Sequence, residues 1–300
     1  MRENILVSCT VLTYNSASTV IETLESIKAQ TYSPIELIIS DDCSKDNTVE
    51  KCREWFQNNK ERFVRAELLT VDKNTGVSAN GNRAIAASKG VWMKGIAADD
   101  KLLPKCVENF IDFVAEHPEA RWVSSKMRAY RNTFDEENYL EDAFKGNKSF
   151  FELDVKGQLN KMATWNRISA PSLFFNTDFF NELGGYNSEY AFEDYPFFVK
   201  ALEHGYKCYF MDKETVCYRI HDSISHTKGQ LFNYAFMQES KRFHIKQLFK
   251  YLTWRQKLAQ RTIWKVQDCF ETLRLNKETR FTSFLYDSLY KILNRLGGLR

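Results

Sequence analysis

Short β-branched runs alternate with longer segments of helical period through the first hundred residues. They predict strands over 5–12, 35–40, 67–71 and 91–97, and helices over 20–27, from Thr48 onward and over 78–88. Strands spaced by helical segments imply parallel βαβ units with right-handed connections. We therefore expect an α/β fold with a doubly wound, mostly parallel central sheet flanked by helices.

Polar motifs follow three of the predicted strands. The residues TYN follow the first strand, Asp41-Asp42 the second and Asp99-Asp100 the fourth. Such sheets bind ligands at the carboxyl ends of their strands, which makes these motifs the candidate site. Adjacent carboxylates repel each other, and Mg²⁺ or Mn²⁺, which prefer oxygen ligands, would remove that cost. Taken alone, Asp99-Asp100 is explained equally well as a helix cap before Pro104.

Two further acidic motifs also have structural explanations. Asp41-Asp42 leads into a helix that Asp46 could cap. Glu193-Asp194 opens a helical run, and negative charge at a helix N-terminus is favourable by itself. Neither pair identifies a site without its neighbours in the sequence.

Beyond residue 103 the pattern is looser, and beyond Gly229 it is entirely helical. The predicted elements are a helix over 104–117, a strand over 121–129, a Gly184-Gly185 turn, a helix through 197–203 and strands over 208–211 and 215–219. Apolar residues then recur at helical spacing over 245–252 and 263–273. We expect a domain of residues 1–229, with halves 1–103 and 104–229, and a helical extension over 230–300.

Charge is divided unevenly along the chain. The net charge is +3, but residues 1–229 hold 28 Lys and Arg against 34 Asp and Glu, whereas residues 230–300 hold 14 against 5. In the basic segment the cations are interleaved with Phe249, Trp254 and Trp264, which is typical of a helix on an anionic membrane surface. A helix packed on the domain with a solvated basic face explains the pattern as well. Nucleic acid is not expected, because the body is acidic.

The cysteines and the apolar runs indicate where in the cell the protein is located. Seven cysteines occur singly, without a Cys-x-x-Cys pair, which is typical of reduced thiols in the cytosol. The N-terminal sequence is too polar for a signal peptide, and no run reaches the ~18 apolar residues of a membrane span. We expect a cytoplasmic protein, with peripheral attachment to the inner face of the cytoplasmic membrane as an option.

Five segments occur in a fixed order over about residues 4–226. They are TVLTYNSASTVIETLESIKAQTY, IELIISDDCSKDNT, NTGVSANGNRAIAASKGVWMKGIAADD, LGGYN and FEDYPFFVKALEHGYK. In this order they resemble glycosyltransferase family 2, of the type that assembles bacterial polysaccharides. The resemblance implies an inverting, hexosyltransferase-type enzyme with the GT-A fold, a Rossmann-like arrangement, and the helical extension lies outside it.

The resemblance implies a nucleotide-sugar site at the strand ends. The residues it assigns to the donor are Leu12 (through its backbone), Tyr14, Asp42, Asn82, Asp99 and Arg219. An aromatic ring can stack on the base, and a carboxylate can accept its imide N–H. Family members often carry an arginine as a phosphate partner where this chain has Gly81, and Arg83 is the candidate substitute.

The resemblance also implies a metal ligand and a catalytic base. Asp100 and His221 are the implied ligands of Mn²⁺ or Mg²⁺, although Ala97 replaces the first aspartate of the family's D-x-D-D pattern. Asp194 is the implied general base, a role that suits a buried carboxylate whose pKa is raised towards neutrality. The metal would take up charge on the departing diphosphate.

We therefore expect transfer of a sugar from a nucleotide-diphosphate donor, UDP-linked, to a hydroxyl of a saccharide or lipid-linked saccharide in cell-surface polysaccharide or lipopolysaccharide synthesis. Two other classes stay open. A non-catalytic nucleotide-sugar-binding protein is suggested by Gly81 and Ala97. A sugar nucleotidyltransferase shares the βαβ nucleotide site but normally has a glycine-rich basic loop after the first strand, where this chain reads TYNSAST.

Overall fold

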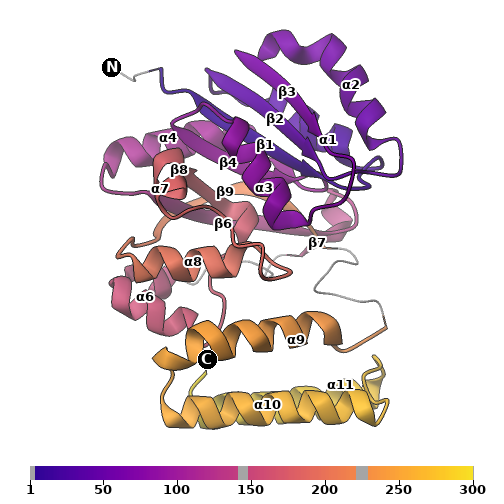
Figure 1. Ribbon diagram of the computed structural model, residues 1–300, viewed down its shortest axis with the longest axis vertical. Helices are drawn as coiled ribbons and strands as arrows, with labels where there is room; N and C mark the ends of the chain where they lie inside the picture. The colour runs from indigo at the N-terminus through magenta and orange to yellow at the C-terminus, as the bar shows by residue number, and fades with distance from the viewer. Residues whose placement is uncertain (1–3, 141–147, 221–228, 300) are drawn as a thin grey trace. The chain divides into compact units, whose positions relative to one another are not determined.

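The computed structural model describes residues 4–140, 148–220 and 229–299. The chain divides into two compact units (Figure 1). The first combines Met1–Val155 with Ile168–Ile220, and the second combines Lys156–Arg167 with His221–Arg300. The predicted domain of residues 1–229 and its halves stay predictions.

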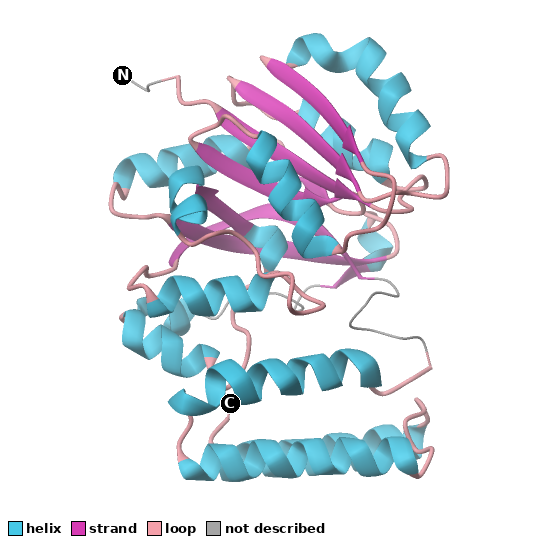
Figure 2. Ribbon diagram, in the orientation of Figure 1, coloured by secondary structure: helices cyan, strands magenta, loops and turns pink. Residues whose placement is uncertain are grey.

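The first unit is built on one mixed sheet, which has nine strands among the described residues (Figure 2). The strands are β1 (Val7–Thr13), β2 (Ile35–Asp41), β3 (Arg65–Thr70), β4 (Trp92–Ala97), β5 (Lys101–Leu102), β6 (Trp122–Arg131), β7 (Tyr139–Leu140), β8 (Leu173–Asn176) and β9 (Tyr209–Ile220). Their order is β3-β2-β1-β4-β8-β6-β9-β5, with β7 paired to β6. The first four strands are parallel, as predicted, and antiparallel β8 joins them to the parallel pair β6 and β9.

The predicted strands over 208–211 and 215–219 are wrong as separate elements. They form one strand, β9, which pairs with β6 along its length and shifts register between Ser125 and Met127. The two shifts skip Asp212, Lys213 and Thr215 of β9, and this polar stretch is where the sequence pattern suggests a break.

The helices of the first unit connect and cover the strands. They are α1 (Val20–Lys28), α2 (Thr48–Asn59), α3 (Val77–Ala87), α4 (Cys106–Glu116), α5 (Lys148–Glu152), α7 (Thr177–Glu182) and α8 (Asp194–Glu203), with 3-10 turns at Lys60–Arg62, Glu136–Asn138 and Ala170–Ser172. Alternate residues of β1, namely Val7, Cys9 and Val11, share one buried cluster with α1, α2 and α4. This packing follows from the period-2 alternation of a strand against the apolar stripe of each helix.

A buried glutamate ties the start of β1 to the turn before β4. Glu36 of β2 accepts hydrogen bonds from the Ser8 hydroxyl at 2.5 Å, the Gly90 N–H at 2.9 Å and Arg65 at 3.0 Å. Burial opposes ionisation, but these bonds outweigh it and hold the pKa of Glu36 below its usual value. The ionised carboxylate therefore fixes the relative position of the strands that carry the predicted site.

The second unit is helical among its described residues. It contains the remainder of α6 (Val155–Met162), α9 (Tyr234–Phe243), α10 (Trp254–Thr272) and α11 (Arg280–Gly297). Between α9 and α10 the chain forms a π-helical turn over His244–Leu248 and a 3-10 turn over Phe249–Tyr251. No helix in the described ranges is both long enough and apolar enough to cross a bilayer.

The basic, aromatic stretch around Phe249, Trp254 and Trp264 is exposed only in part. Trp264 is buried, and its ring stacks on that of the partly buried Phe249 with centroids 5.4 Å apart, so Trp264 belongs to the core. Ile245, predicted to lie in the apolar stripe, is 52% exposed. The reason is the change from π to 3-10 winding, which shifts the helical phase before α10 begins at Trp254.

Candidate functional site

The register of the parallel strands aligns the predicted motifs. Leu12 of β1 lies opposite Ser40 of β2 on one side and Ala97 of β4 on the other. The residues that follow these three positions therefore leave the sheet at the same edge. This edge is the carboxyl end of the parallel strands, where such sheets bind ligands.

The turn after β1 is tied to the loop after β2. Asn15 has a left-handed φ of 51°, its N–H donates to the Ser44 hydroxyl at 2.8 Å, and its Oδ1 accepts from the Lys45 N–H at 2.7 Å. The Leu12 carbonyl accepts from the Ala98 N–H at 3.1 Å. The turn is thus held from both sides, while the Tyr14 ring stays 48% exposed and accessible for stacking.

Asp42, the residue after β2, is buried and bonded within the protein. Its Oδ2 accepts from the N–H groups of Thr75 at 2.9 Å and Gly76 at 2.7 Å. Its Oδ1 accepts from the Thr75 hydroxyl at 2.5 Å and from Arg83 at 3.1 Å. Burial opposes ionisation, but these bonds hold the pKa of Asp42 below its usual value. The carboxylate therefore anchors the loop that leads into α3.

Asn82 of α3 is paired with the backbone of Tyr186. Its Nδ2 donates to the Tyr186 carbonyl at 2.9 Å, and its Oδ1 accepts from the Tyr186 N–H at 2.9 Å. Gly185 has a φ of 71°, and a Cβ there would lie 2.7 Å from the Asn82 Oδ1. The Tyr186 ring covers Gly81, where an added Cβ would lie 3.0 Å from two ring carbons. A side chain at position 81 would require the Tyr186 ring to shift by a few tenths of an ångström, and Arg83 is already engaged by Asp42.

The Asp99-Asp100 pair follows β4 and is packed against the end of β9. Asp100 is buried, and its Oδ1 accepts from the backbone N–H of Arg219 at 2.8 Å. Burial and the neighbouring Asp99 raise the pKa of Asp100 well above its usual value, although Lys94 and Arg219 oppose the rise. A second negative charge is therefore unfavourable here unless a further cation is present.

Arg219 is held by several groups of the protein itself. Its guanidinium donates to the Asp99 carbonyl at 2.7 Å, to Glu22 of α1 at 2.6 Å and to the Asn132 carbonyl. It also lies over the Phe134 ring, 4.2 Å from the ring centroid. With only 9% of its side chain exposed, Arg219 connects the Asp99-Asp100 turn to α1.

The second acidic pair lies near the first. Asp194 is the first residue of α8, and burial together with Asp194 raises the pKa of Glu193 to about 7. Burial raises the pKa of Tyr218 to about 12, with further contributions from Asp100, Asp99 and Asp194. The charges of Asp99 and Asp100 from the first pair and of Asp194 from the second thus act on one phenol. The structure brings the predicted base and the predicted metal ligand into one region, and this region contains a carboxyl group that titrates near neutrality.

The donor set suits a divalent cation that is shared with a substrate. Within the described ranges, no group of three or more His, Cys, Asp or Glu side chains is placed to hold a metal ion by itself. Mn²⁺ and Mg²⁺ need only one or two protein carboxylates when phosphates and water supply the other ligands. The raised pKa of Asp100 fits such a ligand, because a cation would relieve the repulsion from Asp99. The other predicted ligand, His221, lies outside the described residues.

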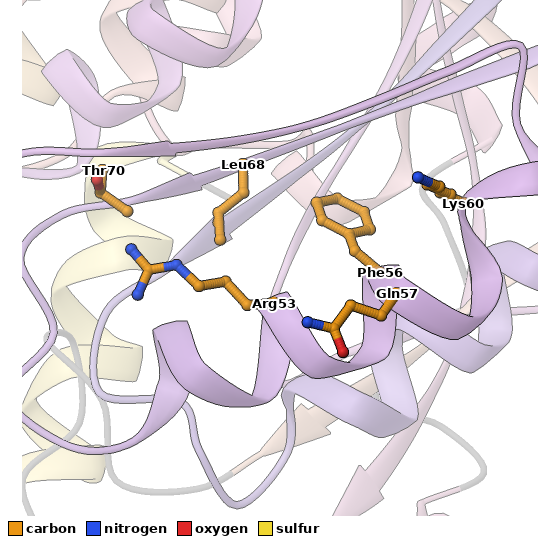
Figure 3. Close-up of a pocket in the computed structure, with 6 residues that line it drawn as sticks. All are labelled: Arg53, Phe56, Gln57, Lys60, Leu68 and Thr70. Carbon is orange, nitrogen blue, oxygen red and sulfur yellow. The ribbon is translucent and has the colours of Figure 1, made fainter.

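A separate cavity of about 400 Å³ lies between α2 and the edge strand β3 (Figure 3). Its lining residues are Arg53, Phe56, Gln57, Lys60, Leu68 and Thr70. Its charged side chains are cationic, and the predicted acidic site is formed by other residues. The cavity therefore adds nothing to the donor site.

Sequence reasoning did not single out two residues that support the site. Lys94 of β4 is fully buried, and its Nζ donates to the carbonyls of Gly95 at 2.9 Å and Pro171 at 2.6 Å. A lysine inside the apolar run VWMKGIA is a signal that could have found it. Glu22, the partner of Arg219, carries no such signal, because the two are 197 residues apart in sequence.

Comparisons with known proteins agree with this architecture. The family model described as "Glycosyl transferase family 2" matches residues 8–170, more than half of the chain. The succinoglycan biosynthesis protein ExoO of Rhizobium meliloti (strain 1021) is 30% identical over 106 residues, which are 35% of this chain and 29% of that protein. The chain thus matches less than a third of that relative's length.

Two solved structures share the fold at 17% sequence identity. S. aureus TarS 1–349 in complex with UDP-GlcNAc has a TM-score of 0.58 and covers 96% of this chain and 72% of its own. The mannosyltransferase PcManGT from Pyrobaculum calidifontis, in complex with GDP-Man and Mn²⁺, has a TM-score of 0.56 and covers 97% and 70%. The fold is therefore the GT-A glycosyltransferase fold with a helical C-terminal region, as predicted. On the extent of the family match, the chain belongs to glycosyltransferase family 2.

Proposed function

We propose that this protein is an inverting, hexosyltransferase-type glycosyltransferase that moves a sugar from a UDP-linked donor to a saccharide hydroxyl. The observation that carries the proposal is the convergence of Asp99, Asp100 and Asp194 on Tyr218. They converge near the strand ends that also present Tyr14 and Asp42. TarS with UDP-GlcNAc and PcManGT with GDP-Man support a nucleotide-sugar as the ligand class.

Tyr14, Asp42 and Asn82 would form the nucleotide end of the site. The exposed Tyr14 ring is free to stack on the base. The Asp42 carboxylate already accepts four hydrogen bonds, which is about its full capacity. A base N–H must therefore displace one donor, and the Thr75 hydroxyl is the one that can rotate away. Asn82 would contribute indirectly, by fixing Tyr186 beside the Leu12 side chain over Gly81.

Asp194 would act as the general base. It accepts the proton of the acceptor hydroxyl as that oxygen attacks the anomeric carbon from the face opposite the diphosphate. The new C–O bond forms while the bond to the diphosphate breaks, so the sugar inverts and UDP leaves. Glu193, with its pKa near 7, shares the negative charge of this pair at neutral pH. General-base catalysis of this kind contributes roughly 10²–10⁴-fold.

Asp100 would hold the divalent cation, Mn²⁺ or Mg²⁺, with His221 as the other ligand. When bound, the cation supplies Lewis-acid stabilisation of the diphosphate. Asp99 is assigned to the ribose or to metal-bound water. Arg219 would orient Asp100 through its backbone N–H, and any contact of its guanidinium with phosphate requires release from Glu22.

The acceptor class follows from relatives and is a proposal as well. ExoO is a succinoglycan biosynthesis protein, which supports a role in cell-surface polysaccharide or lipopolysaccharide assembly. A saccharide or lipid-linked saccharide would then be the acceptor. We place the protein in the cytoplasm, with peripheral attachment to the inner face of the cytoplasmic membrane through residues 230–300.

The substitution Asp194→Asn tests the base. We expect UDP release from UDP-sugars, in the presence of saccharide acceptors, to fall by roughly 10²–10⁴-fold, with donor affinity unchanged within threefold. Asp178→Asn is the matched control, because Asp178 is an exposed aspartate in the first turn of α7. It should keep full turnover. If both variants turn over like the wild type, Asp194 only stabilises a helix terminus and the proposal fails.

A non-catalytic nucleotide-sugar-binding protein is the second candidate. The observation that favours it is that the Tyr186 ring covers Gly81, at the position where family members often carry an arginine for phosphate. The two candidates differ in a wild-type experiment. Turnover of any UDP-sugar, by transfer or by hydrolysis, eliminates the binding protein.

A further inference from the structure

Helix α11 presents an apolar face to solvent. Phe281 is 68% exposed, Phe284 74%, Ile292 56% and Leu296 73%. At 100° per residue, these four positions fall with Leu285, Ser288 and Leu289 within an arc of about 140°. They form one stripe along the helix, which we call the α11 stripe. The two phenylalanine rings alone expose on the order of 250 Å², since each buries ~150–250 Å² when covered.

The opposite side of α11 is already used for packing. Gly297 lies so close to α10 that an added Cβ would be 2.4 Å from the Ala259 Cβ, and Leu299 shares a cluster with Ala259 and Ile263. Gln267 of α10 donates to the Tyr286 hydroxyl at 2.8 Å. These contacts fix the rotation of α11 about its axis, so the apolar residues remain outside. The sequence of the helix is thus apolar on the side that its own unit does not cover.

Cations border the α11 stripe. On the same helical projection Arg295 falls within the arc, Lys291 at its edge and Arg280 just beyond, and all three are exposed. Residues 230–300 as a whole hold 14 Lys and Arg against 5 Asp and Glu. An apolar stripe with cations at its edge matches a bilayer with anionic headgroups, whose acyl region accepts the rings and whose surface attracts the cations.

We propose that α11 lies on an anionic lipid surface and is the element that attaches this protein to a membrane. This deepens the peripheral placement in the proposed function, but it does not depend on transfer activity. A second copy of the chain is a less suitable partner for the α11 stripe than anionic lipid. A two-fold contact would bring two segments of the same strong positive charge together, whereas anionic lipid complements that charge.

Vesicle co-sedimentation of the full chain tests the proposal. We expect binding to phosphatidylcholine vesicles that contain phosphatidylglycerol, and little binding to phosphatidylcholine alone. The double variant Phe281→Ser with Phe284→Ser should lower the partition coefficient at least about tenfold. The matched control is Trp254→Ser with Leu258→Ser, because these α10 residues are 70% and 60% exposed in the same charge background. The control should bind like the wild type.

A second double variant, Lys291→Gln with Arg295→Gln, tests the role of charge. It should remove the preference for anionic vesicles and keep the fold. Circular dichroism shows whether each variant is folded. If the phenylalanine variant is unfolded, the vesicle binding of the charge variant decides whether the proposal holds. Equal binding by the wild type and both α11 variants overturns the proposal, as does no binding by the wild type. A dimer that dissociates in the phenylalanine variant without vesicles assigns the α11 stripe to a second copy instead. Donor-induced thermal stabilisation should be the same in all variants, which separates this test from that of the enzyme.

Discussion

Loss of solvent around the partly buried Glu193, together with the neighbouring Asp194, raises the pKa of its carboxyl group from 4.5 to about 7. Between these values the folded state binds a proton that the unfolded state releases, so the free energy of unfolding falls as pH rises. In Glu193→Gln this contribution is absent. We expect a flatter pH dependence of stability between about pH 5 and 8, with a difference of up to about 3 kcal/mol, measured by urea unfolding.

Glu193→Asp is the control for this experiment. It keeps a titratable carboxyl group at the same helix start, so it should retain most of the wild-type slope. A Glu193→Gln protein whose stability changes with pH as steeply as that of the wild type would assign the slope to other groups. Asp100, whose pKa is also raised by burial and Asp99, would then be the first to consider.

At the residue scale, local sequence predicted the acidic pairs and Tyr14 but not their partners. Asp99-Asp100 and Glu193-Asp194 stand out because adjacent carboxylates repel each other. The hydrogen bonds that Thr75 donates to Asp42 and Arg219 donates to Glu22 join residues 33 and 197 positions apart. Such pairs form only when the sheet and α1 pack together, and the spacing of residues in the sequence does not predict that packing.

The turn between α3 and β4 offers a stability prediction at the scale of elements. A Cβ on Gly90 would lie 2.4 Å from the Ser8 Oγ and 2.5 Å from the Ser8 N. Gly90→Ala should therefore push the turn away from β1 and weaken the Glu36 bonds, at a cost of about 2–4 kcal/mol. In the control Gly95→Ala the nearest atom would be 3.4 Å away, so little change is expected. Chemical denaturation compares the two, and equal losses would contradict the steric explanation.

At the same scale, regular periodicity predicted elements well and irregular winding did not. The strands β1 to β4 begin and end within two residues of the predicted limits, because each is a short run of strand-forming residues bounded by polar turns. The segment 244–251 has helical spacing in sequence, yet it winds as π and 3-10 turns. The spacing of apolar residues measures an average period, and a local change of winding leaves that average almost unaltered.

At the scale of the whole molecule, chain order predicted the GT-A fold, and charge predicted a distinct basic segment. Which residues of that segment lie on its surface could not be predicted from the sequence. Which side of α11 is exposed depends on the fit of Gly297 against Ala259, a contact between two helices. Sequence reasoning left open whether the rings of that segment face a membrane or pack within the protein, and the structure buries Trp264 and exposes Phe284.

Ligand-induced stabilisation is the whole-molecule prediction, because any ligand that binds only the folded chain raises its stability by mass action. At about a hundred times its dissociation constant a UDP-sugar should add about 2.7 kcal/mol, or roughly 5–10 °C in melting temperature. We expect the shift to be larger with Mn²⁺ than with a chelator, and smaller for GDP-sugars at equal concentration.

The variant Asp100→Asn should remove the dependence of this shift on Mn²⁺, while Asp194→Asn should keep it. Equal shifts for UDP- and GDP-sugars would contradict the uridine assignment, and equal shifts with Mn²⁺ and chelator would remove Asp100 as a metal ligand.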